Sequence, residues 1–302
     1  MNKHIQITSI LIIVVILCSV LMIGGVWGVY LFDHSFSESS LTSGSSEEKE
    51  SGASSSTESE EQTTGSITPE KPQNQKRIAL TFDDGPSSSY TAQILDLLEQ
   101  YHAKATFFVC GYQLTQGKQD ILQRTIALGC EIGNHTNTHE KYLTKLSEKE
   151  LLNEIRTTNE KISQLSGVNY NCSVYRPPWG EINRDVVETL LDDGIYMYSI
   201  LWDVDSLDWS YRSQYSKGEI TREKAVSATF ETIVQETKDG SVILMHDIQS
   251  ITPDVVKLVL EKYIAEGYEF VTVSELFGFE NMQDEEAYFN RYRSTNSISQ
   301  MK

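Results

Sequence analysis

Two histidines and a pair of adjacent acids are the residues of this sequence best suited to chemistry. His135 and His139 stand four positions apart, so on one turn both imidazoles can face the same ion. Asp83 and Asp84 follow a short apolar run, and adjacent carboxylates are costly to hold together unless a cation or a shared proton relieves them. With Asp84 as third ligand, the set has the open pattern of a catalytic zinc or similar divalent ion. The alternatives are that the acids only cap the next helix and that one histidine is a polar surface residue.

The remaining polar residues supply an acid and a base for hydrolysis. Asp83 is free to act as general base on a water molecule bound to the ion, which lowers the pKa of that water. His246 is the candidate acid for the leaving group, oriented by Asp208 or, as a second choice, by Asp205. Arg176 can contact a carboxylate with two donors, and paired with Asp83 it would hold the base in place and keep it ionised. A surface salt bridge is the alternative for this arginine.

Two tryptophans can provide walls for a sugar ring. Trp179 and Trp209 each lie beside one of the polar clusters. Their alternative role is packing in the core, and for Trp202 core packing is the preferred interpretation.

The elements that must position these residues form an α/β pattern from Lys76 onward. Seven strand–helix units in about 200 residues predict a parallel sheet, either a barrel or an open doubly wound sheet. The expected strands are Arg77–Phe82, Ala105–Val109, Glu131–Asn134, Val174–Arg176, Tyr196–Trp202, Val242–His246 and Glu269–Val273. The expected helices are Tyr90–Tyr101, Gln119–Leu128, Ser147–Leu165, Asn183–Asp193, Arg222–Lys238 and Pro253–Glu266. Every polar cluster follows a strand, and in a closed barrel those strand ends share one face. No Gly-x-Gly-x-x-Gly follows the first strand, which disfavours a dinucleotide site.

Five motifs in this order resemble the polysaccharide deacetylases, carbohydrate esterase family four, the chitooligosaccharide deacetylase homology domain. The resemblance covers roughly residues 77 to 275. The motifs are Thr81-Phe82-Asp83-Asp84-Gly85-Pro86, His135-Thr136-Asn137-Thr138-His139, Arg176-Pro177-Pro178-Trp179-Gly180, Asp205-Ser206-Leu207-Asp208-Trp209 and Leu244-Met245-His246-Asp247.

The resemblance implies a fold, a metal and a reaction. The fold is a distorted parallel (β/α) barrel of seven or eight units. The metal is a divalent ion, usually zinc, on Asp84, His135 and His139, with cobalt or nickel suited to similar ligands. The reaction removes acetyl groups, most often from N-acetylglucosamine in peptidoglycan or chitin, with Asp83 as base and His246 as acid.

The resemblance also implies where the substrate lies. The backbone N–H of Trp179 would hold the oxyanion together with the metal. Leu244 would line the pocket for the acetyl methyl group, and Pro178 and Trp209 are assigned to the substrate-binding residues with it. Trp179 stands where a tyrosine or phenylalanine is often found, so the shape of the pocket is in question but the backbone donor is not.

The segments before and after this domain differ from it in composition. Residues 10–30 are apolar and long enough to span a bilayer, with residues 1–9 as a short cytoplasmic N-terminus; a cleaved signal peptide is the alternative. Residues 33–76 are rich in Ser and Glu, which predicts a disordered linker. Residues 77–280 are expected to form the catalytic domain, and residues 281–302 a C-terminal extension. A net charge of −18 disfavours nucleic acid as a partner, and no protein partner is indicated. The three cysteines of the domain, Cys110, Cys130 and Cys172, are an odd number and predict no disulfide framework.

Together these features predict a membrane-anchored, extracellular, metal-dependent hydrolase. It would remove N-acetyl groups from N-acetylglucosamine residues of peptidoglycan and would bind this cell-wall glycan as its substrate. One alternative keeps the same site and changes the substrate to chitin oligomers or acetylated xylan. Another is a non-catalytic protein that binds cell-wall glycan on the same fold.

Overall fold

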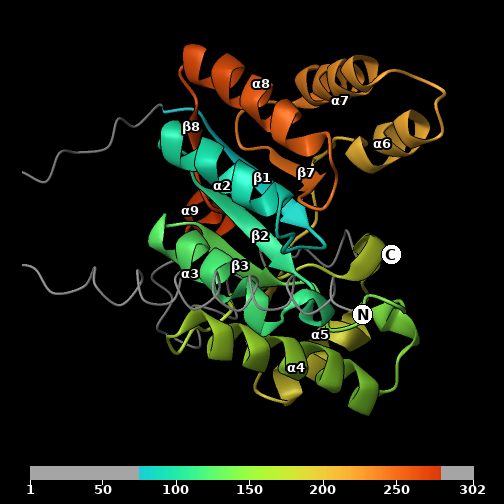
Figure 1. Ribbon diagram of the computed structural model, residues 1–302. Helices are drawn as coiled ribbons and strands as arrows, with labels where there is room; N and C mark the ends of the chain where they lie inside the picture. Colours follow the sequence, from blue (N-terminus) through green and yellow to red (C-terminus); the bar gives the residue numbers. More distant parts are fainter. Residues whose placement is uncertain (1–74, 280–302) are drawn as a thin grey trace, which may run out of the picture. The chain divides into compact units, whose positions relative to one another are not determined.

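The first strand, β1 (Arg77–Asp83), lies in the middle of a parallel sheet (Figure 1). The computed structural model describes residues 75–279. Within that range the other strands are β2 (Ala105–Val109), β3 (Glu131–Asn134), β4 (Val174–Tyr175), β5 (Tyr198–Ser199), β6 (Val204–Asp205), β7 (Val242–His246) and β8 (Glu269–Phe270). Their order is β5-β4-β3-β2-β1-β7-β6, and β8 pairs with the start of β1. β5 and β6 are the two edges of this order, so the described strands leave the sheet open between them. The sheet is therefore a curled half-barrel. The predicted parallel α/β arrangement is confirmed in this form.

The helices form a layer outside the sheet. This layer consists of α2 (Tyr90–Gln100), α3 (Gln119–Ala127), α4 (Glu148–Ser166), α5 (Arg184–Asp192), α6 (Asp208–Ser216), α7 (Arg222–Glu236) and α8 (Thr252–Ala265). The short helix α9 (Val273–Phe277) instead packs on the inner face of the sheet, where Val273 joins Ala79 of β1 in an apolar cluster. Neighbouring helices contact one another in the order α6-α7-α8-α2-α3-α4-α5, which follows the order of the strands (Figure 1). Short 3₁₀ turns η1 (Gly111–Gln113), η2 (Gln116–Lys118), η3 (Leu143–Lys145) and η4 (Pro178–Gly180) lie in the connections.

Alternation along β1 explains why an acid faces the inside of the half-barrel. Ile78, Leu80 and Phe82 are fully buried in the core between sheet and helices. Successive side chains of a strand point to opposite faces, so Thr81 and Asp83 point to the inner face. Each apolar side chain buried in this way contributes about 1.5–3 kcal/mol, which fixes the register of β1 and therefore the direction of Asp83.

The predicted strand Tyr196–Trp202 was wrong in its extent. Its residues give only β5, which pairs with β4, and the chain then crosses to the opposite edge as β6, which pairs with β7. The carbonyls of Ile200 and Leu201 accept hydrogen bonds from Nε and Nη2 of Arg176, at 3.0 and 3.1 Å. Because these carbonyls bind a buried side chain, this part of the segment forms no strand.

The last predicted strand was also too long. Strand pairing stops at Phe270, and the chain turns into α9 at Val273. The Thr272 hydroxyl accepts from the N–H of Glu275 and the Glu275 carboxylate accepts from the N–H of Thr272, a capping box that starts a helix. Helix α6 was not predicted from the sequence. The predicted strand Val174–Arg176 ends one residue earlier, at Tyr175.

Several predictions concern segments outside the described residues. These are the cytoplasmic N-terminus 1–9, the anchor 10–30, the linker 33–76 and the extension 281–302, and all of them stay predictions. Between residues 75 and 279, no helix combines the length and apolar character that crossing a membrane requires. Cys110, Cys130 and Cys172 are buried free thiols.

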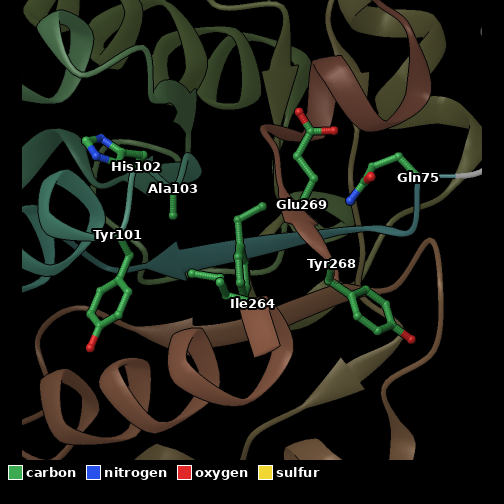
Figure 2. A pocket seen from close by; sticks show the side chains of 8 residues that line it. Gln75, Tyr101, His102, Ala103, Ile264, Tyr268 and Glu269 are labelled. Carbon is green, nitrogen blue, oxygen red and sulfur yellow. The ribbon is translucent and has the colours of Figure 1, made fainter. Parts of the chain in front are cut away.

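A cavity of about 400 Å³ lies at the end of the sheet where the strands begin (Figure 2). Tyr101, His102, Ile264 and Tyr268 are among its lining residues. His102 therefore lies at the end of the sheet opposite to the motif histidines.

Candidate active site

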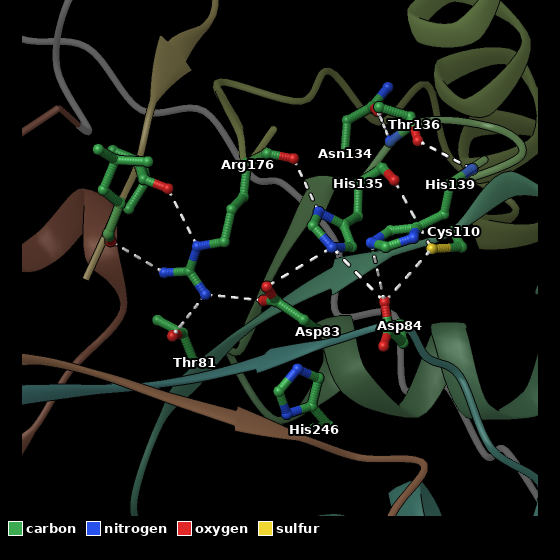
Figure 3. Close-up of polar contacts among 12 residues, drawn as sticks. Thr81, Asp83, Asp84, Cys110, Asn134, His135, Thr136, His139, Arg176 and His246 are labelled. Carbon is green, nitrogen blue, oxygen red and sulfur yellow. Dashed lines mark hydrogen bonds and ion pairs between the residues drawn. The ribbon is translucent and has the colours of Figure 1, made fainter. Parts of the chain in front are cut away.

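The motif residues meet where the strands end (Figure 3). Asp83 is the last residue of β1 and is in register with His246, the last residue of β7. His135 follows β3 directly, and Arg176 follows β4 directly. The parallel sheet thus collects at one end the side chains that the sequence places far apart.

Asp84, His135 and His139 form a three-ligand group. The Nε2 atoms of both histidines lie 3.5 Å from Oδ1 of Asp84, and the ligand atoms of all three residues lie within 4.8 Å of one another. Two ligands that are each about 2.1 Å from a tetrahedral ion are about 3.4 Å apart. The spacing of the donor atoms therefore fits a divalent ion such as zinc.

The ring of His135 is held in the form that binds a metal. Its Nδ1 lies 2.7 Å from the backbone carbonyl of Arg176, so this nitrogen carries the proton and Nε2 presents a lone pair. Burial lowers the pKa of His135 to about 3, which keeps the imidazole neutral. A neutral imidazole is the metal-binding form of histidine.

The turn from His135 to His139 is fixed by helix α4. The Glu154 carboxylate accepts hydrogen bonds from the backbone N–H groups of Asn137 and Thr138, at 2.8 and 2.7 Å. The Asn134 side chain accepts from the N–H of Thr136 and donates to a carbonyl of α4. The sequence gives no sign of this role of Glu154, because nothing in its spacing links it to the histidine motif.

Backbone strain gathers around the site. Non-glycine residues with positive φ include Asp84 (72°), Thr136 (67°), His139 (54°) and Trp179 (57°). This region is costly for residues with a Cβ, and such outliers persist where the surroundings over-determine them, which is typical of functional sites. Two of the three candidate metal ligands are among these residues.

Asp83 and Arg176 form a buried ion pair. Arg176 is fully buried, and its Nη1 donates to Oδ1 of Asp83 at 2.7 Å and to Oγ1 of Thr81 at 2.8 Å. Arg176 does not make the predicted two-pronged contact with Asp83, because its Nε and Nη2 donate to the backbone carbonyls of Ile200 and Leu201. Burial raises the pKa of Asp83, and the Arg176 guanidinium opposes that rise. A base with a raised pKa accepts a proton more readily at neutral pH.

Asp208, the first choice from the sequence, is the partner of His246. Its Oδ1 lies 2.7 Å from Nδ1 of His246, and its Oδ2 accepts from the backbone N–H of His246 and from the Thr252 hydroxyl. Asp205, the second choice, instead accepts from the N–H of Leu207. Burial acts to lower the pKa of His246, but the Asp208 carboxylate overcomes this and raises the pKa to about 9. At neutral pH the ring is therefore an imidazolium that can donate from Nε2.

We expect Asp208→Asn to move the alkaline limb of the pH–activity profile to lower pH by one unit or more. An imidazolium acid loses activity as pH rises through its pKa, and removal of the carboxylate removes the main group that raises this pKa. The measurement is kcat/KM between pH 6 and pH 10. Asp205→Asn is the matched control and should leave the limb in place. An unmoved limb in Asp208→Asn would show that His246 is not the acid.

Comparisons with known proteins identify the family. The model of the polysaccharide deacetylase family matches residues 70–198. Over 223 residues the chain is 34% identical to a peptidoglycan-N-acetylglucosamine deacetylase of Bacillus cereus, covering 73% of this chain and 97% of that protein. The chain belongs to the polysaccharide deacetylase family. The resemblance predicted from the five motifs is confirmed.

Two further relatives of this chain differ in length. The peptidoglycan-N-acetylglucosamine deacetylase PgdA of Listeria monocytogenes is 38% identical over 221 residues, which are 73% of this chain. The chain spans 43% of that protein, less than half its length. The solved structure of the peptidoglycan deacetylase PdaC from Bacillus subtilis superposes with a TM-score of 0.58 at 34% identity, covering 76% of this chain and 98% of that one.

The residues that the sequence assigns to substrate binding differ in their exposure to solvent. Trp179 and Trp209 are half exposed, so their rings are open to a ligand. Leu244 is buried and shares a face of β7 with His246, two positions later. Pro178 is buried within η4. Trp202 packs against an apolar cluster that includes Ala79 and Phe108, as expected from the sequence.

Asp247 is the last residue of the fifth motif, and the structure shows which groups it contacts. Its carboxylate is fully buried, and Oδ2 accepts from the Thr91 hydroxyl at 2.5 Å. A Cβ on Gly85 would lie 2.2 and 2.3 Å from the two carboxylate oxygens. Gly85 is therefore required by close approach of the end of β7, and this contact supports the loop that begins with Asp84. Cys110 also contacts this loop, with Sγ 4.0 Å from Oδ1 of Asp84.

Proposed function

We propose that this chain is a metal-dependent hydrolase that removes N-acetyl groups from N-acetylglucosamine residues of peptidoglycan. One observation carries the proposal: a base, Asp83, and an acid, His246, lie in register on adjacent strands beside a three-ligand metal group. Acyl hydrolysis requires these functions, one to accept a proton from water and one to protonate the leaving nitrogen.

Asp84, His135 and His139 would hold the ion. Two histidines and a carboxylate with the observed spacing suit zinc, and cobalt or nickel suit similar ligands. When bound, such an ion supplies Lewis-acid chemistry, which polarises a carbonyl and lowers the pKa of a water molecule.

The two carboxylate oxygens of Asp83 have different tasks. Oδ1 is held by Arg176, whereas Oδ2 lies 3.5 Å from Nε2 of His135 and so points toward the metal ligands. Oδ2 is the atom that accepts a proton from the attacking water. The new bond joins this water oxygen to the acetyl carbon, and the Trp179 backbone N–H donates to the developing oxyanion.

His246 completes the reaction on the leaving group. Asp208 holds Nδ1, which leaves Nε2–H to donate. As the carbon–nitrogen bond breaks, the sugar nitrogen takes this proton and leaves as an amine, while the acetyl group leaves as acetate. Asp208 keeps the ring charged and correctly turned, the usual task of a carboxylate behind a catalytic histidine.

The choice of peptidoglycan is supported by the names of relatives and by the exposed tryptophans. Proteins named peptidoglycan-N-acetylglucosamine deacetylases align over 73% of this chain. Trp179 and Trp209 present aromatic faces on which sugar rings can pack. The predicted span at residues 10–30 and linker at 33–76 support a single-pass membrane protein with the catalytic domain outside the cell, where this substrate lies. A protein that only binds glycan needs no complete acid–base pair.

A substrate panel tests this proposal. The zinc-loaded protein is offered peptidoglycan, N-acetylglucosamine oligomers and acetylated xylan, and released acetate is measured. We expect the highest kcat/KM with peptidoglycan. Activity confined to xylan would replace the substrate, and no release from any of the three with metal bound would favour the non-catalytic binding protein.

A further inference from the structure

A chain of aromatic rings leads outward from the candidate metal centre to a residue outside the five motifs. The His139 ring packs against the Trp179 ring in a T-shaped contact, at a centroid distance of 4.7 Å. Trp179 in turn contacts Tyr142 at 4.6 Å. Tyr142 follows the metal-ligand candidate His139 by three residues, so one short loop carries both.

The outer two rings are open to solvent. Trp179 is 51% exposed and Tyr142 is 41% exposed. Apolar rings that pack on each other and remain uncovered beside a catalytic group mark a ligand-binding surface more often than a structural one.

The loops that carry these rings are fixed to each other. Leu143, next to Tyr142, is 1% exposed and anchors its loop in the core. The Thr144 hydroxyl donates to the carboxylate of Glu181, two residues after Trp179. The two rings therefore form a preorganised wall and lose little freedom when a ligand packs on them.

We propose that Tyr142 and Trp179 form a subsite for the sugar next to the one being deacetylated. Pyranose rings have apolar C–H faces, and packing such a face on an aromatic ring removes apolar surface of both from water. Trp179 packs against the candidate metal ligand His139, and Tyr142 lies one ring farther out. A sugar that packs on Tyr142 is therefore the neighbour of the sugar that is deacetylated. The subsite rests on the proposed function, and it makes Tyr142 a determinant of preference for polymeric substrate.

The test is steady-state kinetics of the zinc-loaded full chain on the pentamer of N-acetylglucosamine. We expect Tyr142→Ala to raise KM about tenfold, which corresponds to about 1.4 kcal/mol, with kcat within twofold of the wild type. Tyr142→Phe keeps the ring and should keep the wild-type KM. Tyr196→Ala is the matched control, because Tyr196 is 40% exposed and precedes β5 at the opposite end of the sheet.

Two results would overturn the subsite. An unchanged KM in Tyr142→Ala would show that the ring does not bind substrate. A fall in kcat together with lost zinc would show that Tyr142 acts only by supporting His139.

If the wild type releases no acetate from any glycan, the proposed function fails separately. Calorimetric titration of the pentamer then still decides the subsite, since Tyr142→Ala should raise its Kd about tenfold and an equal Kd would refute it.

Discussion

Replacing Asp83 with asparagine is expected to lower kcat/KM about 1,000-fold while zinc remains bound. The amide can still accept the hydrogen bond of Arg176 Nη1, which is 2.7 Å from Oδ1 in the wild type. The amide cannot take a proton from water in place of Oδ2, the wild-type oxygen that points toward the candidate metal ligands. The three candidate ligands, Asp84, His135 and His139, are unchanged, so the metal content should stay close to one ion per chain.

Kinetics and metal analysis of the same preparation separate the two roles of this acid pair. Acetate release is measured with peptidoglycan, and bound zinc is measured by atomic absorption. Asp84→Asn, the neighbouring variant, should differ from Asp83→Asn by losing zinc affinity. Turnover by Asp83→Asn within tenfold of the wild type would refute its role as base.

Replacing Arg176 with methionine is expected to lower the free energy of unfolding by about 3–5 kcal/mol. The guanidinium is fully buried and binds Asp83, Thr81 and two backbone carbonyls, and it also packs 4.2 Å from the Phe108 ring centroid. Methionine fills part of the volume but leaves the Asp83 carboxylate buried without its cation. Removing one partner of a buried pair leaves an uncompensated charge, which is why the loss is large.

Urea unfolding of the metal-free protein gives this free energy without the added stability of a bound ion. Arg184→Met is the control, because the Arg184 side chain on α5 is 57% exposed. Its Nε lies 3.7 Å from Oε1 of Glu188, a long distance for an ion pair. This control substitution should change the free energy by less than about 1 kcal/mol. An Arg176→Met protein as stable as the control would mean that the buried pair contributes little.

Asp83 and His246 could be placed from the sequence, because each ends a short apolar run that forms a strand, β1 or β7. Ile78, Leu80 and Phe82 fix β1, and the parallel sheet then brings its last residue beside His246. Asp208, which the sequence favours over Asp205, is also the residue that contacts His246 in the structure.

Other features depend on tertiary contacts that no local pattern records. The strand expected at Tyr196–Trp202 is shorter than predicted because Arg176, more than twenty residues earlier, binds the carbonyls of Ile200 and Leu201. Tyr142 has the same appearance in sequence as any surface tyrosine, and only the ring contact with Trp179 distinguishes it. By contrast, the helix after Thr272 had a readable signal, the capping box with Glu275.

Acetate release before and after metal removal tests most directly whether this chain is a metal-dependent deacetylase. The purified protein is assayed on peptidoglycan as prepared, after treatment with a chelator, and after return of zinc or cobalt. We predict that release falls to the background rate with the chelator and recovers with the ion. Release that continues unchanged in metal-free protein would contradict the role of Asp84, His135 and His139, and with it the mechanism.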